Sequence, residues 1–456
     1  MINRKLDNYI EQHFKNSRSA LMLTGTRQTG KTFAIRKYAQ SKGLNLIEIN
    51  FYEDNAAYRI FEGAQTAKDV LMRISAHTHK STSANNTLIF FDEVQQCPQA
   101  VTWVKFLADE GSCQYALSGS LLGVELKDIA SVPVGYMALK EVFPLDFEEF
   151  VRALGISNEV LSAVQQCMRE AKPVDDVIHQ SLLKALHLYL ITGGMPAVVQ
   201  TYLDTNDCNV LAEKQREILA LYRWDISKYD PNKKLNIHEI FDIIPSELNA
   251  KNKRFILKNL NEHARFSRYS DSFLWLKDAG VAIPTYNVNE PSIPLKLNEQ
   301  RNLFKLFQND VGLLACQYAA GLQIKLLSGE TTINYGAIYE NYVAQELFAH
   351  GFGGHDHSLY YFNNKKQGEL DFIVEHDGKI LPIEVKSGKD YDRHKALKNV
   401  MQNADYGIER AIVFCNGNVE RKENITYLPI YMTMFLEKRQ PQAKQDFHLD
   451  LSGLTV

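Results

Sequence analysis

The segment GTRQTGKT, residues 25–32, decides the fold of the first part of the chain. It follows a short apolar run at residues 21–23 and precedes a helical pattern over residues 31–42. The segment matches G-x-x-x-x-G-K-[ST] in full, between a strand and a helix, which is the setting that this motif requires. Its glycines let backbone N–H groups turn towards phosphate oxygens at the positive end of the helix. The segment therefore predicts a phosphate-binding loop, or P-loop.

The side chains of the loop indicate a nucleoside triphosphate as the ligand. We expect Lys31 to reach the β- and γ-phosphates and the Thr32 hydroxyl to bind Mg²⁺. ATP and Mg²⁺ are therefore the predicted cofactors. The predicted nucleotide-binding residues are Gly25, Thr26, Arg27, Gln28, Thr29, Gly30, Lys31, Thr32, Phe33 and Asp92.

A second segment, LIFFDE at residues 88–93, supplies the acids that such a site needs. It is an apolar strand that ends in two carboxylates, and in α/β sheets ligands bind at the carboxyl ends of the strands. Asp92 is predicted to hold Mg²⁺, and Glu93 to orient and deprotonate the attacking water. The alternative is a strand that ends in two solvated acids.

A third strand, YALSGS at residues 115–120, ends in hydroxyls. We expect it to lie between the other two strands, so that Ser118 or Ser120 touches the γ-phosphate or the water. A serine-capped turn is the alternative. The predicted catalytic residues are Glu93, Lys31 and Ser118.

The order of the patterns predicts a multidomain α/β protein. Short apolar strands alternate with helices in residues 1–150, which is typical of a parallel sheet with helices on both faces. Residues 151–235 are helical, and residues 236–294 form a small basic, helix-rich segment. Strands and helices alternate again over residues 295–456, with a hairpin expected to turn at residues 376–379.

The chain resembles prokaryotic AAA-type ATPases that carry an uncharacterised C-terminal domain. The resemblance covers nearly the whole chain, through LIFFDEVQQ, ALSGSLLG, FPLDFEEF, YLITGGMPAVV, RWDISKY, WLKDAGV, FKLFQNDVGLL, GAIYENYVAQEL and IEVKSG, in addition to the P-loop. It implies an ATPase core at 1–150, a helical lid at 151–235, a winged helix at 236–294 and a restriction-endonuclease-like domain at 295–456.

One departure from the family pattern concerns hydrolysis. Many relatives carry Gly-Arg before the FPLDFEEF stretch, whereas this chain has Gly135-Tyr136. If the missing arginine stabilises charge during hydrolysis, its absence puts fast turnover in doubt, because such arginines are worth several powers of ten in rate. Arg152 and Arg223 are the candidates that we consider to replace it.

Two further clusters suggest nucleic-acid chemistry. Lys251, Lys253, Arg254 and Lys258 surround the expected second helix of the winged helix, and they would contact DNA phosphates or simply face water. Glu340, Asp371, Glu384 and Lys386 follow the order E…D…E-x-K of metal-dependent nucleases with the restriction-endonuclease-like fold. Glu384 and Lys386 lie two apart on a strand and so share a face. The three carboxylates are predicted to hold a divalent cation beside Lys386, or else to form surface pairs in a domain that does not cleave.

Other features limit the class of protein. The net charge of −3 indicates no overall attraction to nucleic acid, and the six cysteines form no C-x-x-C pair. No stretch approaches the length of a membrane span, so we expect a cytoplasmic protein without membrane contact. The cluster His355-Asp-His357 in a glycine-flanked loop is a weak metal motif.

Three functions remain open from the sequence. The first is an ATPase coupled to DNA or RNA binding or processing. The second is a nucleotide-switched scaffold that grips a protein partner or a second copy of itself. The third is a small-molecule kinase, which Glu93 and the serine-tipped strand disfavour because they point to water as the acceptor.

Overall fold

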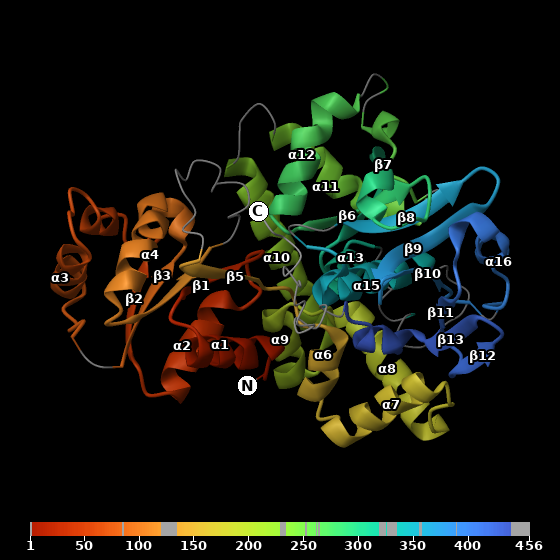
Figure 1. Ribbon diagram of the computed structural model, residues 1–456, viewed down its shortest axis with the longest axis horizontal. Coiled ribbons are helices and arrows are strands. Elements are labelled where there is room, and N and C mark those ends of the chain that lie inside the picture. The colour runs from red at the N-terminus through yellow and green to blue at the C-terminus, as the bar shows by residue number, and fades with distance from the viewer. Residues whose placement is uncertain are drawn as a thin grey trace, which may run out of the picture.

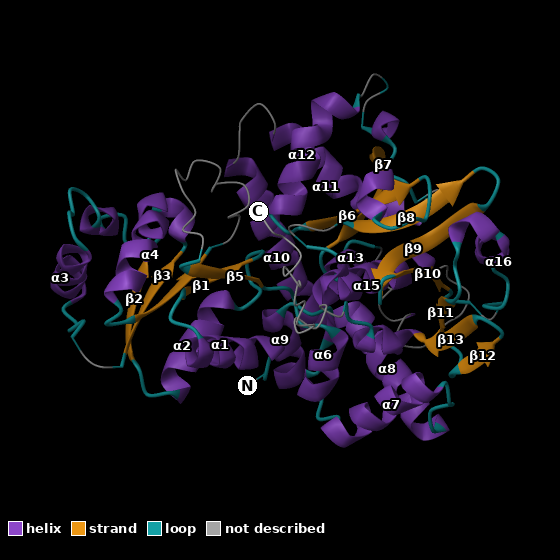
Figure 2. Cartoon of the chain, viewed as in Figure 1, coloured by secondary structure: helices purple, strands orange, loops and turns teal. Residues whose placement is uncertain are grey.

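The computed structural model describes residues 2–83, 86–119, 135–228, 234–250, 253–260, 262, 265–318, 325, 335–354, 358–388 and 390–438. Figure 1 shows a sheet at each end of the molecule, with helices between the two sheets. Figure 2 separates the same helices and strands by colour. Ser120, Lys251 and the His355–His357 cluster, which the sequence singled out, lie outside the described residues.

The N-terminal sheet has five strands, all parallel, in the order β2-β3-β4-β1-β5. This confirms the predicted parallel-sheet core. It also places β4, the serine-tipped strand, between the strand before the P-loop and the acidic strand, as expected. The strands are β1 (Ala20–Thr24), β2 (Asn45–Asn50), β3 (Thr87–Asp92), β4 (Gln114–Ser118) and β5 (Met137–Glu141), and the helices around them are α1 (Lys5–Asn16), α2 (Lys31–Ser41), α3 (Ala67–Thr78) and α4 (Pro98–Glu110).

The acidic strand β3 is buried along its whole length because helices cover both faces of the sheet. Leu88 and Phe90 pack on the side of α1 and α2. Ile89 and Phe91 point the other way and pack with α3 and α4. The alternation of neighbouring side chains therefore fixes Asp92 at the end of a rigid, fully covered strand.

Helices fill the middle of the chain. They are α6 (Phe147–Ala153), α7 (Asn158–Glu170), α8 (Asp176–Thr192), α9 (Pro196–Thr205), α10 (Cys208–Lys228), α11 (Lys234–Asn249) and α12 (Phe266–Asp278). Helix α11, in the segment predicted as helix-rich, ends at Asn249. No single described helix is long and apolar enough to cross a membrane, although α8 and α9, bent by 118° at the break between them, pass that test as a pair.

The second sheet is mixed and has eight strands in the order β12-β13-β11-β10-β9-β8-β6-β7. Its elements are β6 (Ala282–Val288), β7 (Glu299–Gln308), α13 (Val311–Cys316), α15 (Gly336–Leu347), β8 (Leu359–Asn364), β9 (Gly368–His376), β10 (Lys379–Val385), α16 (Lys395–Gln402), β11 (Ala411–Cys415), β12 (Glu420–Lys422) and β13 (Ile425–Pro429). The predicted hairpin is confirmed, since β9 and β10 turn through Asp377 and Gly378, both with positive φ.

The boundary predicted between residues 294 and 295 falls inside this sheet. Strand β6, assigned from the sequence to a winged helix, pairs with β7 on one side and β8 on the other. The segment 236–294 therefore shares its sheet with the C-terminal part of the chain. The winged helix itself stays a prediction.

A buried aspartate joins the central helices to the second sheet. Asp310, the N-cap of α13, accepts hydrogen bonds from Gly194 N at 2.6 Å and Leu313 N at 2.9 Å. A Cβ on Gly193 would lie 2.1 Å from the Asp310 carboxylate, and one on Gly312 would lie 2.5 Å from the backbone of Thr192. Only glycine fits at either position. This contact gives a structural reason for GGMPA and NDVG, which lie within two of the strings that carry the family resemblance.

Arg4, at the start of the chain, joins the P-loop to α6. Its guanidinium donates to Glu149 Oε2 at 2.9 Å, to Phe143 O at 2.9 Å and to Thr29 O in the P-loop at 3.2 Å. Asp146, the N-cap of α6, in turn contacts His350 Nε2 at 3.3 Å. A continuous set of polar contacts therefore runs from the P-loop to the helical turn that follows α15.

Candidate functional site

The P-loop lies between β1 and α2, as the sequence predicted. Gly30 has φ 88° and caps the N-terminus of α2, and Gly25 has φ 122°. A Cβ on Gly25 would lie 2.3 Å from Val142 O, so the loop packs directly against the backbone that follows β5. The two glycines thus allow backbone angles that other residues rarely adopt and allow close packing, and they leave room for a phosphate to approach the backbone.

Asp92 gathers the hydroxyls of two other elements. Thr32 Oγ1, on α2, donates to Asp92 Oδ2 at 3.0 Å. Ser118 Oγ, at the end of β4, donates to Asp92 Oδ1. Burial raises the pKa of Asp92, and the two hydroxyl hydrogen bonds oppose that shift. Thr32, Asp92 and Ser118, each singled out in the sequence, therefore form one hydrogen-bonded group.

Lys31 is buried with its ammonium held inside the loop. Its Nζ donates to Gly25 O at 2.8 Å and Thr26 O at 2.7 Å. Burial lowers the pKa of Lys31 to about 8, although the negative charges of Glu93 and Asp92 oppose the shift. A phosphate in the loop would add negative charge beside this amine and favour its protonated form.

Glu93 follows Asp92 in a backbone conformation that is uncommon for a residue with a side chain. Its φ is 54°, in the left-handed region. Its carboxylate accepts a hydrogen bond from Gln95 Nε2, and its backbone N–H donates to Asp92 Oδ1 at 3.1 Å. Strained residues of this kind concentrate at functional sites. Sequence reasoning did not single out Gln95.

The P-loop opens into a cavity of about 520 Å³, within the usual size range of ligand pockets. One wall is formed by the P-loop and Glu93. Another is formed by α9, which lies in the expected lid but contains no residue that the sequence singled out for the site. Phe33 is 53% exposed at this opening. The lining residues are Ile2, Arg4, Leu6, Asp7, Arg27, Gln28, Gly30, Lys31, Thr32, Phe33, Ala34, Arg36, Glu93, Pro196, Ala197 and Gln200.

The two arginines considered as replacements for the missing one do not line this cavity. Arg152 pairs with Glu148 at 2.6 Å on the surface of α6, and Arg223 pairs with Asp242 at 2.9 Å. Tyr136, which stands where relatives carry arginine, lies under Lys105, whose Nζ is 5.4 Å from the ring centroid. Although Arg152 and Arg223 lie near family motifs in the sequence, neither side chain lies in the nucleotide cavity.

The C-terminal set also comes together, on the second sheet. Asp371 lies on β9, Glu384 on β10 and Glu340 on α15, with Lys386 just after β10. Lys386 Nζ is 2.5 Å from Glu384 Oε1, and Asp371 Oδ2 accepts from Val385 N at 2.8 Å. Burial raises the pKa of Glu384 to about 8, and the charge of Asp371 adds to the shift. Burial and Asp371 likewise raise the pKa of Glu340.

Two lysines that the sequence did not connect with this cluster pair with its acids. Lys305 on β7 is fully buried, and its Nζ lies 2.8 Å from Glu369 Oε1, 3.6 Å from Glu340 Oε2 and 4.0 Å from Asp371 Oδ1. Lys253 pairs with the other oxygen of Glu340. For Lys253 the sequence left open a contact with DNA phosphate or a position facing water. The structure pairs it with Glu340, because a buried carboxylate requires a counter-charge.

The carboxylates are not arranged as a ready metal centre. In the described part of the chain, no group of three or more His, Cys, Asp or Glu side chains is placed to hold a metal ion. Two oxygens, Glu340 Oε2 and Glu384 Oε2, are buried there without a hydrogen bond. The donor atoms for a cation are therefore present, but the space around them is shared with ammonium groups.

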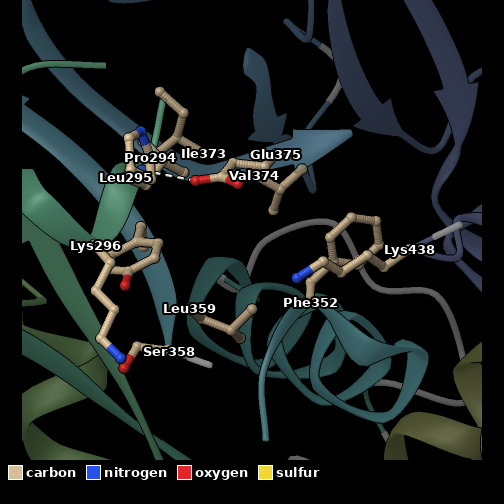
Figure 3. A pocket seen from close by; sticks show the side chains of 11 residues that line it. Pro294, Leu295, Lys296, Phe352, Ser358, Leu359, Ile373, Val374, Glu375 and Lys438 are labelled. Carbon is tan, nitrogen blue, oxygen red and sulfur yellow. Dashed lines mark hydrogen bonds between the residues drawn. The ribbon is translucent and has the colours of Figure 1, made fainter. Parts of the chain in front are cut away.

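A separate cavity of about 210 Å³ lies in the C-terminal region, between β8, β9 and the segment after β6. Figure 3 shows its mostly apolar lining, with Glu375 accepting from Leu295 N at 2.7 Å. It contains none of the residues predicted from the sequence as a site.

Comparisons with known families divide the chain in three. Residues 17–151 match the family described as an AAA domain. Residues 183–324 match a "Domain of unknown function (DUF8612)", and residues 335–433 match a "Domain of unknown function (DUF4143)". The N-terminal part of the chain therefore matches an AAA domain, and this match supports ATP binding. The nuclease-like character of the C-terminal domain stays a prediction.

Among solved structures, the chain is similar to a Walker-type ATPase of Pyrococcus abyssi, at 13% identity and a TM-score of 0.43, over 70% of this chain and 96% of that one. It is also similar to the Orc1 protein of Aeropyrum pernix in complex with DNA, at 13% identity and a TM-score of 0.25, over 72% and 91% of the two chains. C. elegans PCH-2 matches at 14% identity and a TM-score of 0.24, over 44% and 60%. No curated protein matches.

The buried lysine predicts a large effect on stability. Changing Lys305 to Met should destabilise the protein by about 3–5 kcal/mol, because it leaves buried carboxylates without their counter-charge. Urea unfolding of the C-terminal region measures this. Lys366→Met, at an exposed position nearby, is the matched control. Equal stability of the two variants would contradict the assigned role of Lys305.

Proposed function

We propose that this protein hydrolyses ATP and uses the nucleotide state to change how its helical segment and C-terminal domain hold a partner. One observation carries the ATPase proposal. The Asp92 carboxylate accepts the hydroxyls of Thr32 and Ser118 at the end of the P-loop, beside Glu93. That arrangement brings a phosphate-binding loop, a metal-side carboxylate and a candidate base to one sheet edge.

The donors present in the cleft fit a magnesium-bound nucleotide. Asp92 and Thr32 offer a buried carboxylate and a hydroxyl, the oxygen ligands that Mg²⁺ prefers, and Lys31 is already desolvated inside the loop. When bound, Mg²⁺ would neutralise phosphate charge. Lys31 would exchange the carbonyls of Gly25 and Thr26 for phosphate oxygens.

Hydrolysis in this site follows from the position of Glu93. Its carboxylate accepts a proton from water as the water oxygen bonds to the γ-phosphorus. The bond between that phosphorus and the β–γ bridging oxygen breaks, leaving ADP and phosphate. Gln95 Nε2 donates to the Glu93 carboxylate and so orients it in the resting state. Water as acceptor favours an ATPase over a small-molecule kinase.

Coupling to the rest of the chain is supported by two contacts of the P-loop and the helices beside it. Arg4 connects Thr29 of the loop to α6. Gly194, two residues before Pro196 in the wall of the cleft, is held by Asp310. A movement of α9 on nucleotide binding would therefore act on α13 and the second sheet. We infer that α6–α10 form the lid of this site.

For the C-terminal domain, we favour partner binding over cleavage. Lys253, Lys305 and Lys386 already pair with Glu340, Glu369 and Glu384. Because these lysines already supply positive charge to the carboxylates, a divalent cation would gain less binding free energy there. Nucleic-acid processing remains the second candidate, supported by the meeting of Glu340, Asp371, Glu384 and Lys386 in one cluster. The partner of the scaffold would be a protein, a second copy of the chain, DNA or RNA.

Glutamine at position 93 separates binding from chemistry. Glu93→Gln should bind ATP as the native protein does but turn it over at least 100-fold more slowly, because the base is lost while the phosphate contacts remain. Lys31→Ala should instead weaken ATP binding more than tenfold, or at least about 1.4 kcal/mol. Calorimetry and phosphate release measure the two effects. Lys42→Ala, at the far end of α2, is the control.

Equal turnover of the native protein and Glu93→Gln would remove Glu93 from the mechanism. Native phosphate release no faster than uncatalysed ATP hydrolysis would contradict the ATPase proposal. Unchanged ATP affinity in folded Lys31→Ala would contradict the P-loop assignment.

Divalent cations test the C-terminal domain. Without nucleotide, the native protein and Glu384→Gln should give the same Mn²⁺ binding isotherm, and neither should cleave single- or double-stranded DNA or RNA. Isothermal calorimetry and gel assays measure this. Cleavage by the native protein that Glu384→Gln lacks would overturn the scaffold proposal and establish the nuclease alternative.

A further inference from the structure

The cleft contains four cationic side chains, and three of them already have defined tasks. Lys31 lies inside the P-loop. Arg4 commits all three of its nitrogens to Glu149, Phe143 O and Thr29 O. Arg36 makes a two-pronged ion pair with Glu48, at 2.8 and 2.5 Å, on the exposed side of α2. Arg27 is the fourth cationic side chain that lines the cleft, and no role has yet been assigned to it.

Arg27 lies on the side of the cleft where hydrolysis would occur. Its guanidinium carbon is 5.9 Å from the ring centroid of Tyr52, which follows β2. Strand β2 pairs with β3, and the register sets Asn50 opposite Asp92. Arg27 therefore lies towards the strand end that carries Asp92 and Glu93. Arg27 and Glu93 also line the same cavity.

Asp225 on α10 holds the guanidinium in place. The Nε of Arg27 lies 3.0 Å from Asp225 Oδ2, and the carboxylate is 6% exposed. The contact is a charge pair, because Nε itself makes no hydrogen bond to any described residue, and an arginine has five N–H donors. The Arg27 side chain itself is 25% exposed. A buried acid on one helix thus fixes an arginine whose side chain still reaches the open cleft.

Helix α10 has further contacts around the loop. Tyr222, one turn before Asp225, accepts a hydrogen bond from Asn309 Nδ2 at 3.3 Å. Asn309 immediately precedes Asp310, which binds Gly194. The helix that carries Asp225 is therefore tied to the same residues that join the second sheet to the lid.

We propose that Arg27 is the charge-stabilising arginine of this ATPase, supplied from within the P-loop, and that Asp225 is its positioning residue. This inference rests on the proposed ATP hydrolysis. Negative charge spreads over the γ-phosphoryl oxygens as the bond to the β–γ bridging oxygen breaks and the bond to water forms. The Arg27 guanidinium donates N–H bonds to those oxygens and is unchanged by the reaction. Arginines in this role contribute about 10³–10⁵ in rate.

Substitution of Arg27 should therefore affect turnover more than binding. With native full-length protein as reference, Arg27→Ala should lower kcat at least 100-fold while changing the ATP Kd less than fivefold. It should also lose the trapping of ADP with aluminium fluoride, an analogue of the transferring phosphoryl group. Arg27→Lys should recover part of kcat, and Asp225→Asn should lower kcat less than Arg27→Ala does. Arg152→Ala and Arg223→Ala, outside the cleft, are the controls.

Three results would overturn this assignment. The first is a kcat of Arg27→Ala within threefold of the native value. The second is a loss in Arg27→Ala that appears wholly in ATP affinity, with kcat and fluoride trapping retained. The third is native phosphate release no faster than uncatalysed ATP hydrolysis, which removes the proposed hydrolysis itself and with it any need for this arginine. Only the third result also contradicts the proposed function.

Discussion

The buried carboxylate of Asp310 is the constraint on which the relation between the two sheets depends. It binds the backbone of Gly194 and caps α13 at the same time, so the turn before α9 and the start of α13 occupy one fixed position. Gly193 and Gly312 must lack side chains for the segments to approach so closely. Because α9 forms a wall of the nucleotide cleft, a contact in the C-terminal half of the chain helps to shape the ATP site.

Much of the ATP site could be predicted from the sequence, because its chemistry is local. Gly30, Lys31 and Thr32 act within one turn, and burial of β3 forces Asp92 to the edge of the sheet. Arg4 and Asp225 could not be predicted in this way. Each reaches the P-loop from a distant part of the chain, and neither lies in a pattern that signals phosphate binding. Their roles depend on tertiary packing, which a linear motif does not encode.

The C-terminal domain illustrates the opposite case, where residues were found but their partners were not. The strand spacing correctly placed Glu384 and Lys386 in contact, and the hairpin brought Asp371 to the same region. The sequence did not indicate that Lys305 is buried, because a single lysine on an apolar strand is usually expected to face solvent. In the structure it is the most completely buried charge of the cluster, and Lys253 turns inwards with it. Acids alone suggested a metal site, whereas in the structure three lysines pair with these acids.

In the proposed mechanism, the nucleotide cleft and the second sheet respond to the nucleotide together. Hydrogen exchange of the Glu93→Gln protein, with and without Mg-ATP, tests this most directly. We expect protection from exchange to change together in the P-loop, around residues 193–200 and around residues 304–316, because Asp310 joins the last two segments. Changes confined to residues 17–151, with the second sheet and α13 unaffected, would contradict it.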